Sequence, residues 1–363
     1  FLDLNFINNE LAKRQQGKGR GGRMKIETDT IELKSGVRFQ KTTGAPICIE
    51  IKNKDFENWK IPMSPEAINF AVFDETVKRE IKEKINEKSI TRPRPGHADL
   101  SGAIKYHHKD MRDVLERSSA RETATRVAVG AICQNILRNF NITGEFKTLS
   151  VGGKTTEDEI DKIIEEAKKE GESLGGELEI QFKNLPVGLG SFVHWDRRLD
   201  GRLAGAMMSI PAVKAVEIGM GKGVSGLCGS RVHDEIFINT ANTDMPDNTN
   251  GASFVNPTIY RKTNNAGGIE GGMTNGENVI VRLSMKPIPT MRKPLNSINI
   301  KTKAAEQAHF ERADTCAVEA LGTVALNMAS IIILDAFFEK FGPDNFDETM
   351  KNFKNYKEYA GKF

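Results

Sequence analysis

Apolar residues recur along the chain at two spacings, one typical of helices and one typical of strands. Helical spacing occurs at residues 6–14, 156–170 and 320–334. Strict alternation of apolar and polar residues, which predicts strands, occurs at residues 25–30, 47–51 and 177–182. Alternation buries one face of a strand and leaves the other face wet, as in antiparallel sheets. The pattern therefore predicts helices combined with antiparallel strands.

The stretch from residue 92 to residue 131 joins a rigid loop to a helix with one face of small residues. The prolines and glycine of Arg92-Pro93-Arg94-Pro95-Gly96-His97 exclude a helix, so His97 is expected on a rigid loop. Ser119 and Glu122 have the spacing of a capping box, which predicts the start of a long helix. Its narrow face permits close approach to neighbouring helices and consists of Thr123, Ala124, Val127, Ala128, Ala131 and Ile132.

Two arginines and two hydroxyls are expected at the start of this helix. They are Arg117, Ser118, Ser119 and Arg121. Unpaired N–H groups and the positive end of the helix dipole favour an anion at such a place. Each residue alone is more often a solvated side chain or a simple cap. Together, downstream of a histidine in a proline-rich loop, they predict a phosphate or phospho-ligand site.

A second basic segment follows the first predicted helix. Residues 15–24 alternate glycines with Lys18, Arg20 and Arg23. Bare backbone N–H groups beside positive charge suit a phosphate or a carboxylate, although such a stretch is more often a flexible surface loop. RNA binding by this loop is an alternative function. It predicts nearby exposed aromatic residues, yet none lies between Phe6 and Phe39.

Composition bounds the class of protein. The 363 residues are 38% hydrophobic and 28% charged, as in a soluble globular chain of one large domain or two. A net charge of +3 gives no reason to expect nucleic acid as a partner. The cysteines lie far apart without a CxxC pair, so no metal site is indicated and a reducing, cytoplasmic setting is expected. The uncharged run at residues 320–334 is too short to span a membrane and predicts a buried helix.

Two segments are expected to stand apart from the core. Residues 64–90 are charge-rich, with Ile81 and Ile85 at helical spacing, and predict a peripheral charged helical insertion. Residues 244–257 are rich in asparagine, aspartate, proline and glycine and predict a mobile loop. Neither segment carries a candidate catalytic residue.

The chain resembles the chorismate synthase family over nearly its whole length. The matching motifs are RPGHAD from Arg94 to Asp99, RSSARET from Arg117 to Thr123, and a segment similar to RRQxGxGRGGRM that ends at Met24. The family normally begins with an AGESHG segment that carries a second catalytic histidine, and this chain begins after it. We expect a leader segment with that histidine in the working protein.

The resemblance implies a fold of the α+β class, a βαβ sandwich with antiparallel sheets enclosed by helices. It also implies a single domain over residues 1–363 and a homotetramer. The residues alone point in the same direction. Both halves of the chain show strand pairs that lead through a glycine-rich turn into a helix with a cationic start, which suggests two related layers.

The function that the resemblance implies is a carbon–oxygen lyase of the shikimate pathway, which serves aromatic amino acid biosynthesis. It removes phosphate and a ring hydrogen from 5-enolpyruvylshikimate 3-phosphate by 1,4-elimination, giving chorismate. Reduced FMN is expected as cofactor without net redox change, and the sequence leaves open whether the chain reduces it with NADPH or depends on an external flavin reductase. A flavoprotein oxidoreductase is an alternative, yet no GxGxxG follows a strand here. No membrane partner is expected.

The resemblance also implies roles for individual residues. His97, the one histidine in a motif-bearing loop, is the expected acid, and Asp314 is expected to act near the flavin. The expected substrate-binding residues are Arg14, Arg20, Arg23 and Arg121. The expected flavin contacts are Arg117, Ser118, Ser119, Ala212, Gly271, Lys286, Pro287, Ile288, Pro289, Thr290 and Arg312. From the residues alone, 263–273 is an ordinary glycine-rich hairpin and Arg312 and Asp314 form a structural ion pair.

Overall fold

The computed structural model describes residues 1–21, 28–238, 259–310 and 314–362. Several expectations lie outside these described residues. They concern Arg23, Arg312, the mobile loop at residues 244–257 and the first part of the strand at residues 25–30.

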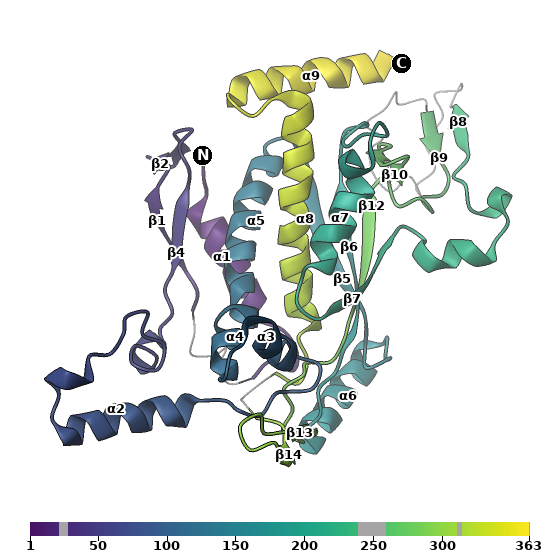
Figure 1. Cartoon of the computed structure of the whole chain (residues 1–363). Helices are drawn as coiled ribbons and strands as arrows, with labels where there is room; N and C mark the ends of the chain where they lie inside the picture. Colours follow the sequence, from purple (N-terminus) through teal and green to yellow (C-terminus); the bar gives the residue numbers. More distant parts are fainter. Residues whose placement is uncertain (22–27, 239–258, 311–313, 363) are drawn as a thin grey trace.

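Three helices pack together at the centre of the molecule, as Figure 1 shows. They are α1 (Leu4–Gln15), α5 (Thr123–Arg138) and α8 (Val318–Phe341). The small-residue face predicted for α5 is buried, which confirms the close helix approach. Gly130 of α5 comes so near α8 that an added Cβ would lie 2.2 Å from the Asn327 carbonyl oxygen. Small residues thus set the distance between these two helices.

Helix α8 includes the buried helix predicted at residues 320–334 and is longer than that uncharged run. Its 24 residues are long and apolar enough to cross a membrane by length and composition, and 72% of its most apolar window is buried inside the molecule. Ala325, Ala329 and Ile333 have no exposed surface. The helix therefore serves as the core helix of this fold.

A four-stranded antiparallel sheet covers one side of the helices. Its order is β5 (Thr143–Val151), β6 (Gly176–Lys183), β12 (Val279–Met285) and β7 (Val213–Ile218). Leu178, Ile180 and Phe182 of β6 are buried, which confirms the alternation read from the sequence. Helices α6 (Glu157–Glu170) and α7 (Leu199–Met208) connect strands of this sheet, and α6 confirms the amphipathic helix predicted there.

A smaller antiparallel pair, β1 (Ile31–Ser35) and β4 (Cys48–Ile51), lies on the other side of α1 (Figure 1). The α+β class is confirmed, with the helices in the middle layer and sheets on either side. The strand predicted up to residue 30 is wrong for residues 28–30, which pair with no other strand in the described chain. The reason is Asp29, whose buried side chain turns inward to two arginines instead of following a sheet register.

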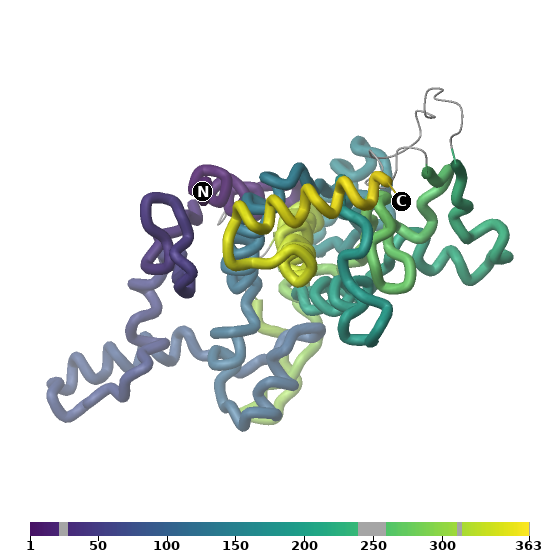
Figure 2. The backbone as a smooth tube through the Cα atoms, turned by 90° about the horizontal axis from the view of Figure 1, so that it is seen from above, coloured from purple at the N-terminus to yellow at the C-terminus, as the bar shows by residue number. Residues whose placement is uncertain are grey.

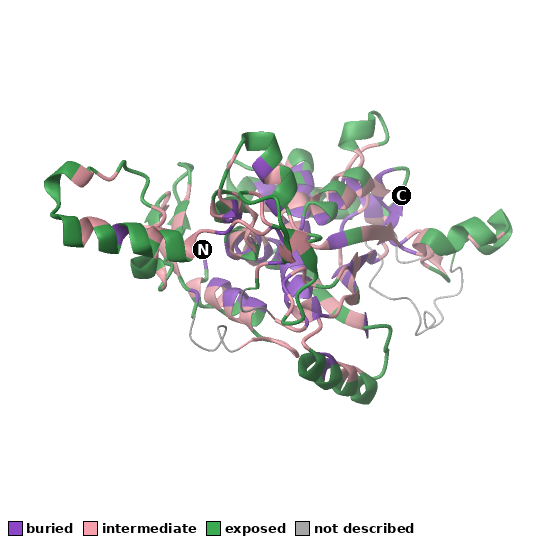
Figure 3. Ribbon diagram, turned by 60° about the horizontal axis from the view of Figure 1, so that its bottom comes forward, coloured by how far each residue is buried: buried purple, intermediate pink, exposed green. Residues whose placement is uncertain are grey.

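The charged segment at residues 64–90 projects from the body of the molecule, as Figures 2 and 3 show. Its helix is α2 (Glu75–Lys88), which is shorter than the predicted helical segment. Ile81 is the buried residue of this helix, and its other positions are exposed or half-buried. The peripheral position of this helix is as expected.

A small second cluster holds the loop that follows α2. Helices α3 (Asp99–Tyr106) and α4 (Met111–Ser118) bury Ala103, Met111 and Leu115 against Ile90. The hairpin of β13 (Asn296–Ile298) and β14 (Ala305–Gln307) fastens the loop from the other side, because Ser297 Oγ donates to the Pro93 carbonyl at 2.5 Å.

The remaining described elements lie at the periphery. Helix α9 (Phe346–Lys362) crosses the end of α8 and packs on it through aromatic side chains. The short antiparallel pairs are β2 (Val37–Arg38) with β3 (Lys41–Thr42), β8 (Ile236–Ile238) with β9 (Ile259–Arg261), and β10 (Ile269–Glu270) with β11 (Met273–Thr274).

The start of α5 differs from the predicted capping box. Ser119 Oγ accepts the Arg121 N–H at 3.3 Å, and a short 3-10 turn, Ala120–Glu122, precedes the helix. The Glu122 carboxylate does not return to Ser119 but pairs with Arg126 at 2.9 Å. The prediction is wrong because a cation one turn further along offers this carboxylate a stronger, charge-assisted partner than a neutral N–H.

Candidate active site

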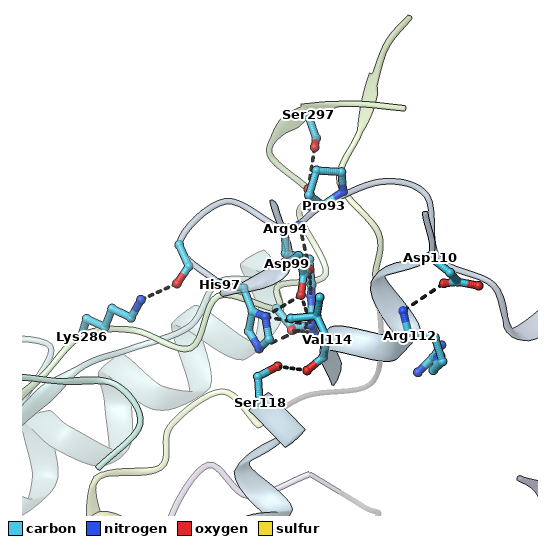
Figure 4. Close-up of polar contacts among 12 residues, drawn as sticks. Pro93, Arg94, His97, Asp99, Asp110, Arg112, Val114, Ser118, Lys286 and Ser297 are labelled. Atoms are coloured by element: carbon cyan, nitrogen blue, oxygen red, sulfur yellow. Dashed lines mark hydrogen bonds and ion pairs between the residues drawn. The ribbon is translucent and has the colours of Figure 1, made fainter. Parts of the chain in front are cut away.

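His97 belongs to a compact network with Asp99 and Arg94, shown in Figure 4. The loop turns at Gly96, with φ +77°, and α3 begins at Asp99, so both side chains meet at the helix start. His97 Nδ1 lies 2.6 Å from Asp99 Oδ1. Arg94 Nε and Nη2 donate to the same carboxylate at 2.8 Å and 3.0 Å. The His97 side chain is 17% exposed and Asp99 is fully buried, so the ring alone reaches the surface.

The charge on Asp99 is stabilised by its neighbours. Burial by itself raises the pKa of this carboxyl group. Hydrogen bonds from His97 and from the Arg94 side chain and backbone outweigh burial and hold the pKa of Asp99 well below its usual value. The network therefore contains a carboxylate that stays ionised at neutral pH.

The segment 286–290 lies directly against the histidine loop. Arg94 Nη1 donates to Thr290 Oγ1 at 2.9 Å, and Lys286 Nζ contacts the Gly96 carbonyl. The Lys286 backbone N–H donates to the carbonyl of Ala212 at 3.0 Å. Expected flavin contacts from two distant parts of the sequence, Ala212 and the segment 286–290, thus meet, and the segment 286–290 also contacts the histidine loop.

Lys286 carries a positive charge that lacks a carboxylate partner within the described chain. Burial, and then the nearby charge of Lys214, lower the pKa of Lys286. A bound anion would relieve both effects.

Arg20 and Asp314 form an ion pair across the chain. Arg20 Nη1 lies 2.5 Å from Asp314 Oδ2, and the Gly21 N–H donates to Oδ1 at 2.6 Å. Gly19 has φ +78°, and a Cβ there would lie 2.8 Å from Cys316 Cβ. The glycine loop therefore folds closely against the segment before α8, and its described arginine points into the protein.

Next to this ion pair lies an arginine cluster, formed by Arg14 and Arg121 around Asp29. One carboxylate, Asp29, pairs with Arg14 Nη2 at 2.8 Å and with Arg121 Nη1 at 2.5 Å. Burial lowers the pKa of Arg14 even though Asp29 opposes the shift. Arg14 Nε and Arg20 Nε are buried and find no hydrogen-bond partner among the described residues. These two guanidinium N–H groups are therefore donors that no acceptor of the described chain satisfies.

A cavity of about 270 Å³ lies between the glycine loop, the Asp314 segment, the segment 290–292 and the end of α6, which contributes Glu165 and Lys168. One wall is formed by Arg20, Gly21 and Asp314, and another by the segment from Thr290 to Arg292. Because Thr290 also binds Arg94, the cavity adjoins the His97 network. An anionic ligand in this cavity would meet charged and polar groups from the glycine loop, the Asp314 segment and the segment 286–290.

Two of the expected flavin contacts, Arg117 and Ser118, are not among the residues that line this cavity. Arg117 and Ser118 end α4, so the expected helix N-terminus is wrong for them. The Arg117 side chain is 84% exposed and lies 3.7 Å from Glu122, and Ser118 Oγ donates to the Val114 carbonyl at 2.8 Å. The flavin role of these two residues stays a prediction.

Gly271 is also separate from this group. It forms the turn between β10 and β11 with Gly272, and both have positive φ, as an ordinary glycine hairpin requires. Strand β12 separates it from Lys286, a span of roughly 20 Å for seven extended residues. A second cavity, of about 340 Å³, lies beside this hairpin, and Asp234 and Glu270 are among its lining residues. The flavin contact at Gly271 stays a prediction.

Reasoning from the sequence missed Arg94, Asp99 and Asp29 as site residues. The first two lie inside the RPGHAD motif, and an aspartate two residues after a candidate acid is a usable signal. Asp29 gives no such signal, because only the folded chain brings it to Arg14 and Arg121.

Comparisons with known proteins agree on one family. A family model described as chorismate synthase matches residues 1–338. The chorismate synthase of Caldanaerobacter subterraneus subsp. tengcongensis is 46% identical over 363 residues, covering 100% of this chain and 93% of the relative. Chorismate synthase 2 of Bacillus cereus is 44% identical over 389 residues, with the same two coverages. A crystal structure of a chorismate synthase superposes with a TM-score of 0.72 at 34% identity, covering 100% of this chain and 91% of that chain.

Proposed function

The chain belongs to the chorismate synthase family, and from this premise we propose how its residues perform the reaction. It is a carbon–oxygen lyase that converts 5-enolpyruvylshikimate 3-phosphate to chorismate by 1,4-elimination of phosphate. The observation that carries the residue assignment is the convergence of Arg20, Asp314 and Thr290 on one cavity next to His97.

The arginines are proposed to bind the substrate, which carries a phosphate and two carboxylates. Arg20 lines the cavity, and its buried Nε is available as a further donor. Arg14 and Arg121 share a single carboxylate and lie behind it in the arginine cluster. Guanidinium groups suit this task because their planar donors match phosphate and carboxylate oxygens. A substrate anion would supply the acceptors that this cluster lacks.

Reduced FMN is the proposed cofactor, and the residues present fit it. Lys286 has a pKa lowered by burial and by Lys214, so it would gain from an anionic phosphate group. Thr290 opens on the cavity, and Ala212 adjoins Lys286 through the backbone. We therefore propose that the segment 286–290 and Ala212 hold the flavin. When bound, reduced flavin would supply transient electron density without net redox change.

His97 is proposed to act as the proton donor of the site. Its ring is the exposed member of the network, while Arg94 and Asp99 are buried behind it. In the elimination phosphate leaves with the electron pair of the C–O bond, one C–H bond of the ring breaks, and the ring double bond shifts as a second one forms. The ring hydrogen balances the proton that the departing phosphate takes up. Arg20 would hold the departing anion, and Asp314, fixed by Arg20 and the Gly21 N–H, would act near the flavin.

The two alternative functions lose their support. RNA binding required a free basic loop, yet Arg20 pairs with Asp314 and Arg14 with Asp29. Net hydride transfer is not the chemistry of the family to which the chain belongs.

We also propose a homotetramer in a reducing, cytoplasmic setting. Exposed apolar side chains at Phe192, Val193 and Trp195 support contact with further copies, and four unpaired cysteines fit a reducing compartment. Light scattering would measure the assembly, and a monomeric mass would contradict it. Whether an external flavin reductase is a partner can be measured by adding NADPH without any reductase.

The residue assignment is tested by anaerobic phosphate release from 5-enolpyruvylshikimate 3-phosphate with reduced FMN. We expect His97→Ala to lower the turnover number by about 10²-fold to 10⁴-fold, the range for a lost general acid. His107→Asn, at the exposed C-terminal end of α3, is the matched control, because asparagine tolerates the positive φ of this position, and it should behave as the parent. Equal rates for the parent and His97→Ala would contradict the role of His97.

A further inference from the structure

Asp99 has an environment unlike that of an ordinary helix-start aspartate. It is fully buried and accepts four contacts, the Arg94 backbone N–H and Nε on Oδ2, and Arg94 Nη2 and His97 Nδ1 on Oδ1. Both carboxylate oxygens are therefore fixed from two directions. Such a group cannot turn away from the histidine without breaking several charge-assisted hydrogen bonds.

We propose that Asp99 is the positioning residue of His97, holding the ring with its proton on Nδ1 so that Nε2 is the nitrogen that exchanges protons with the substrate. This inference rests on the proposed function of His97 as the acid. An ionised carboxylate can only accept hydrogen bonds, so the 2.6 Å contact requires the proton to be on Nδ1. Asp99 thereby selects Nε2 of His97 for proton transfer, although Asp99 itself does not contact the substrate.

Arg94 completes the arrangement from beside the ring. Two of its nitrogens pair with Asp99, and the third reaches Thr290 Oγ1 at 2.9 Å. Nη2, one of the two that pair with Asp99, also lies 3.2 Å from Nδ1 and 3.4 Å from Nε2 of His97. Arg94 therefore keeps Asp99 ionised and ties the histidine loop to the segment 286–290. Since the pKa of Asp99 lies well below its usual value, the shared proton stays on the histidine side of the contact.

A purely structural role for Asp99 predicts different behaviour. In that case replacing it would lower the stability of α3 and leave the ring of His97 free to keep its protonation pattern. The two roles are thus separated by the tautomer of His97 and by the turnover number of correctly folded variants.

The first test measures the tautomer in the parent protein. Histidine labelled with ¹⁵N is incorporated, and the His97 ring signals are assigned by their absence in His97→Gln. The spectra are recorded at a pH at which the neutral ring is observed. There we expect the proton of the parent ring on Nδ1 and a changed tautomer ratio in Asp99→Asn. A neutral parent ring with its proton on Nε2 would overturn the proposal, and this arm needs no variant of Asp99 to fold.

The second test compares carboxylate-to-amide changes in neighbouring positions. Asp99→Asn should lower the turnover number by about 10²-fold while KM stays within about threefold, since the loss is one of acid catalysis. Asp110→Asn is the matched control, because Asp110 accepts the backbone N–H groups of Ile90 and Arg112 and is bonded to no histidine among the described residues. It should keep the turnover number of the parent.

The outcomes separate this proposal from the proposed function. If His97→Ala is impaired and folded Asp99→Asn turns over like the parent, the positioning role is overturned and the role of His97 stands. If His97→Ala is unimpaired, the acid assignment fails and this proposal fails with it. Far-ultraviolet circular dichroism establishes that each variant is folded.

Discussion

Arg14 and Arg121 both pair with Asp29. They approach its carboxylate from α1 and from the turn before α5, and Arg14 also donates to Thr123 Oγ1 at 3.2 Å. Arg14 is buried, its pKa is lowered by burial in spite of this carboxylate, and its Nε has no acceptor among the described residues. An anion beside Arg14 would offset the cost of this burial.

Asp99 should make the stability of the protein depend on pH in acid. Its folded-state pKa is lowered by hydrogen bonds from His97 and Arg94 in spite of burial, whereas the unfolded chain titrates at about 4. The stabilisation from ionised Asp99 is therefore present above about pH 5 and is lost as the pH falls toward the folded-state pKa. Urea denaturation of the parent and Asp99→Asn should show a stability difference that is constant from about pH 6 to 8 and shrinks below about pH 4. A difference that grows in acid would contradict this assignment.

The cysteines should divide into two reactivity classes. Cys48 and Cys228 are exposed, whereas burial, together with Asp335, raises the pKa of Cys133 to about 12, and burial raises the pKa of Cys316. Because the thiolate is the reactive form, an aromatic disulfide reagent at pH 8 should modify Cys48 and Cys228 rapidly and the other two only after unfolding. Cys48→Ser should leave one rapid thiol. Rapid reaction of all cysteines in the native protein would refute the burial of Cys133 and Cys316.

At the scale of the elements, the packing of α5 against α8 determines the position of the arginine cluster. Asn327 of α8 is fully buried and bonds to Gln134 of α5 and to Glu10 of α1, at 2.8 Å and 3.1 Å. A buried polar network of this kind fixes the register of the helices that share it. Arg14 lies one turn beyond Glu10, so the same register places it against Thr123.

Gly130→Ala should strongly weaken this helix packing. Its new Cβ would lie 2.2 Å from the Asn327 carbonyl oxygen, a backbone atom that cannot give way alone. We expect a loss of about 2–3 kcal/mol or more in the free energy of unfolding, measured by chemical denaturation.

Gly205→Ala on α7 is the matched control, since an added Cβ meets nothing within 4 Å. Here alanine should stabilise the helix by up to about 1 kcal/mol. Two variants with similar stability would show that α5 and α8 are not in close contact.

At the scale of the whole molecule, the candidate site and the aromatic cluster of α9 lie at opposite ends of α8. Asp314 precedes the helix, and α9 packs against its far end (Figure 1). A helix of 24 residues is about 36 Å long. The aromatic cluster of α9 can therefore change without moving the site.

Phe353→Ala should lower stability and spare catalysis. Phe353 is 6% exposed, and its ring centroid lies 5.4 Å from that of Phe140 and 5.5 Å from those of Phe337 and Phe341. Truncation should cost about 3–5 kcal/mol in thermal or urea unfolding, while the turnover number at low temperature stays within about twofold of the parent. Tyr359→Ala, on the same helix and 62% exposed, should change stability by less than about 0.5 kcal/mol. A large fall in turnover for folded Phe353→Ala would show coupling along α8.

The sequence by itself determined the elements whose pattern is local. Alternation located β6 and its inward side chains, helical spacing located α1 and α6, and the proline-rich motif marked the His97 loop. These succeed because strand and helix periods act on neighbouring residues. The predicted strand at residues 28–30 is wrong because Asp29 pairs with the distant Arg14 and Arg121. The predicted capping box at Ser119 is wrong because Glu122 pairs with Arg126.

Only the tertiary structure decided which motifs share a site. It joined the glycine loop to Asp314, Thr290 to Arg94, and Asp29 to Arg121, over separations of 294, 196 and 92 residues. It also placed Arg117 at the end of α4 instead of the start of α5, and Gly271 in a hairpin. The physical reason is that ion pairs and cavities depend on distance in space, which packing of α1, α5 and α8 sets and no local spacing records.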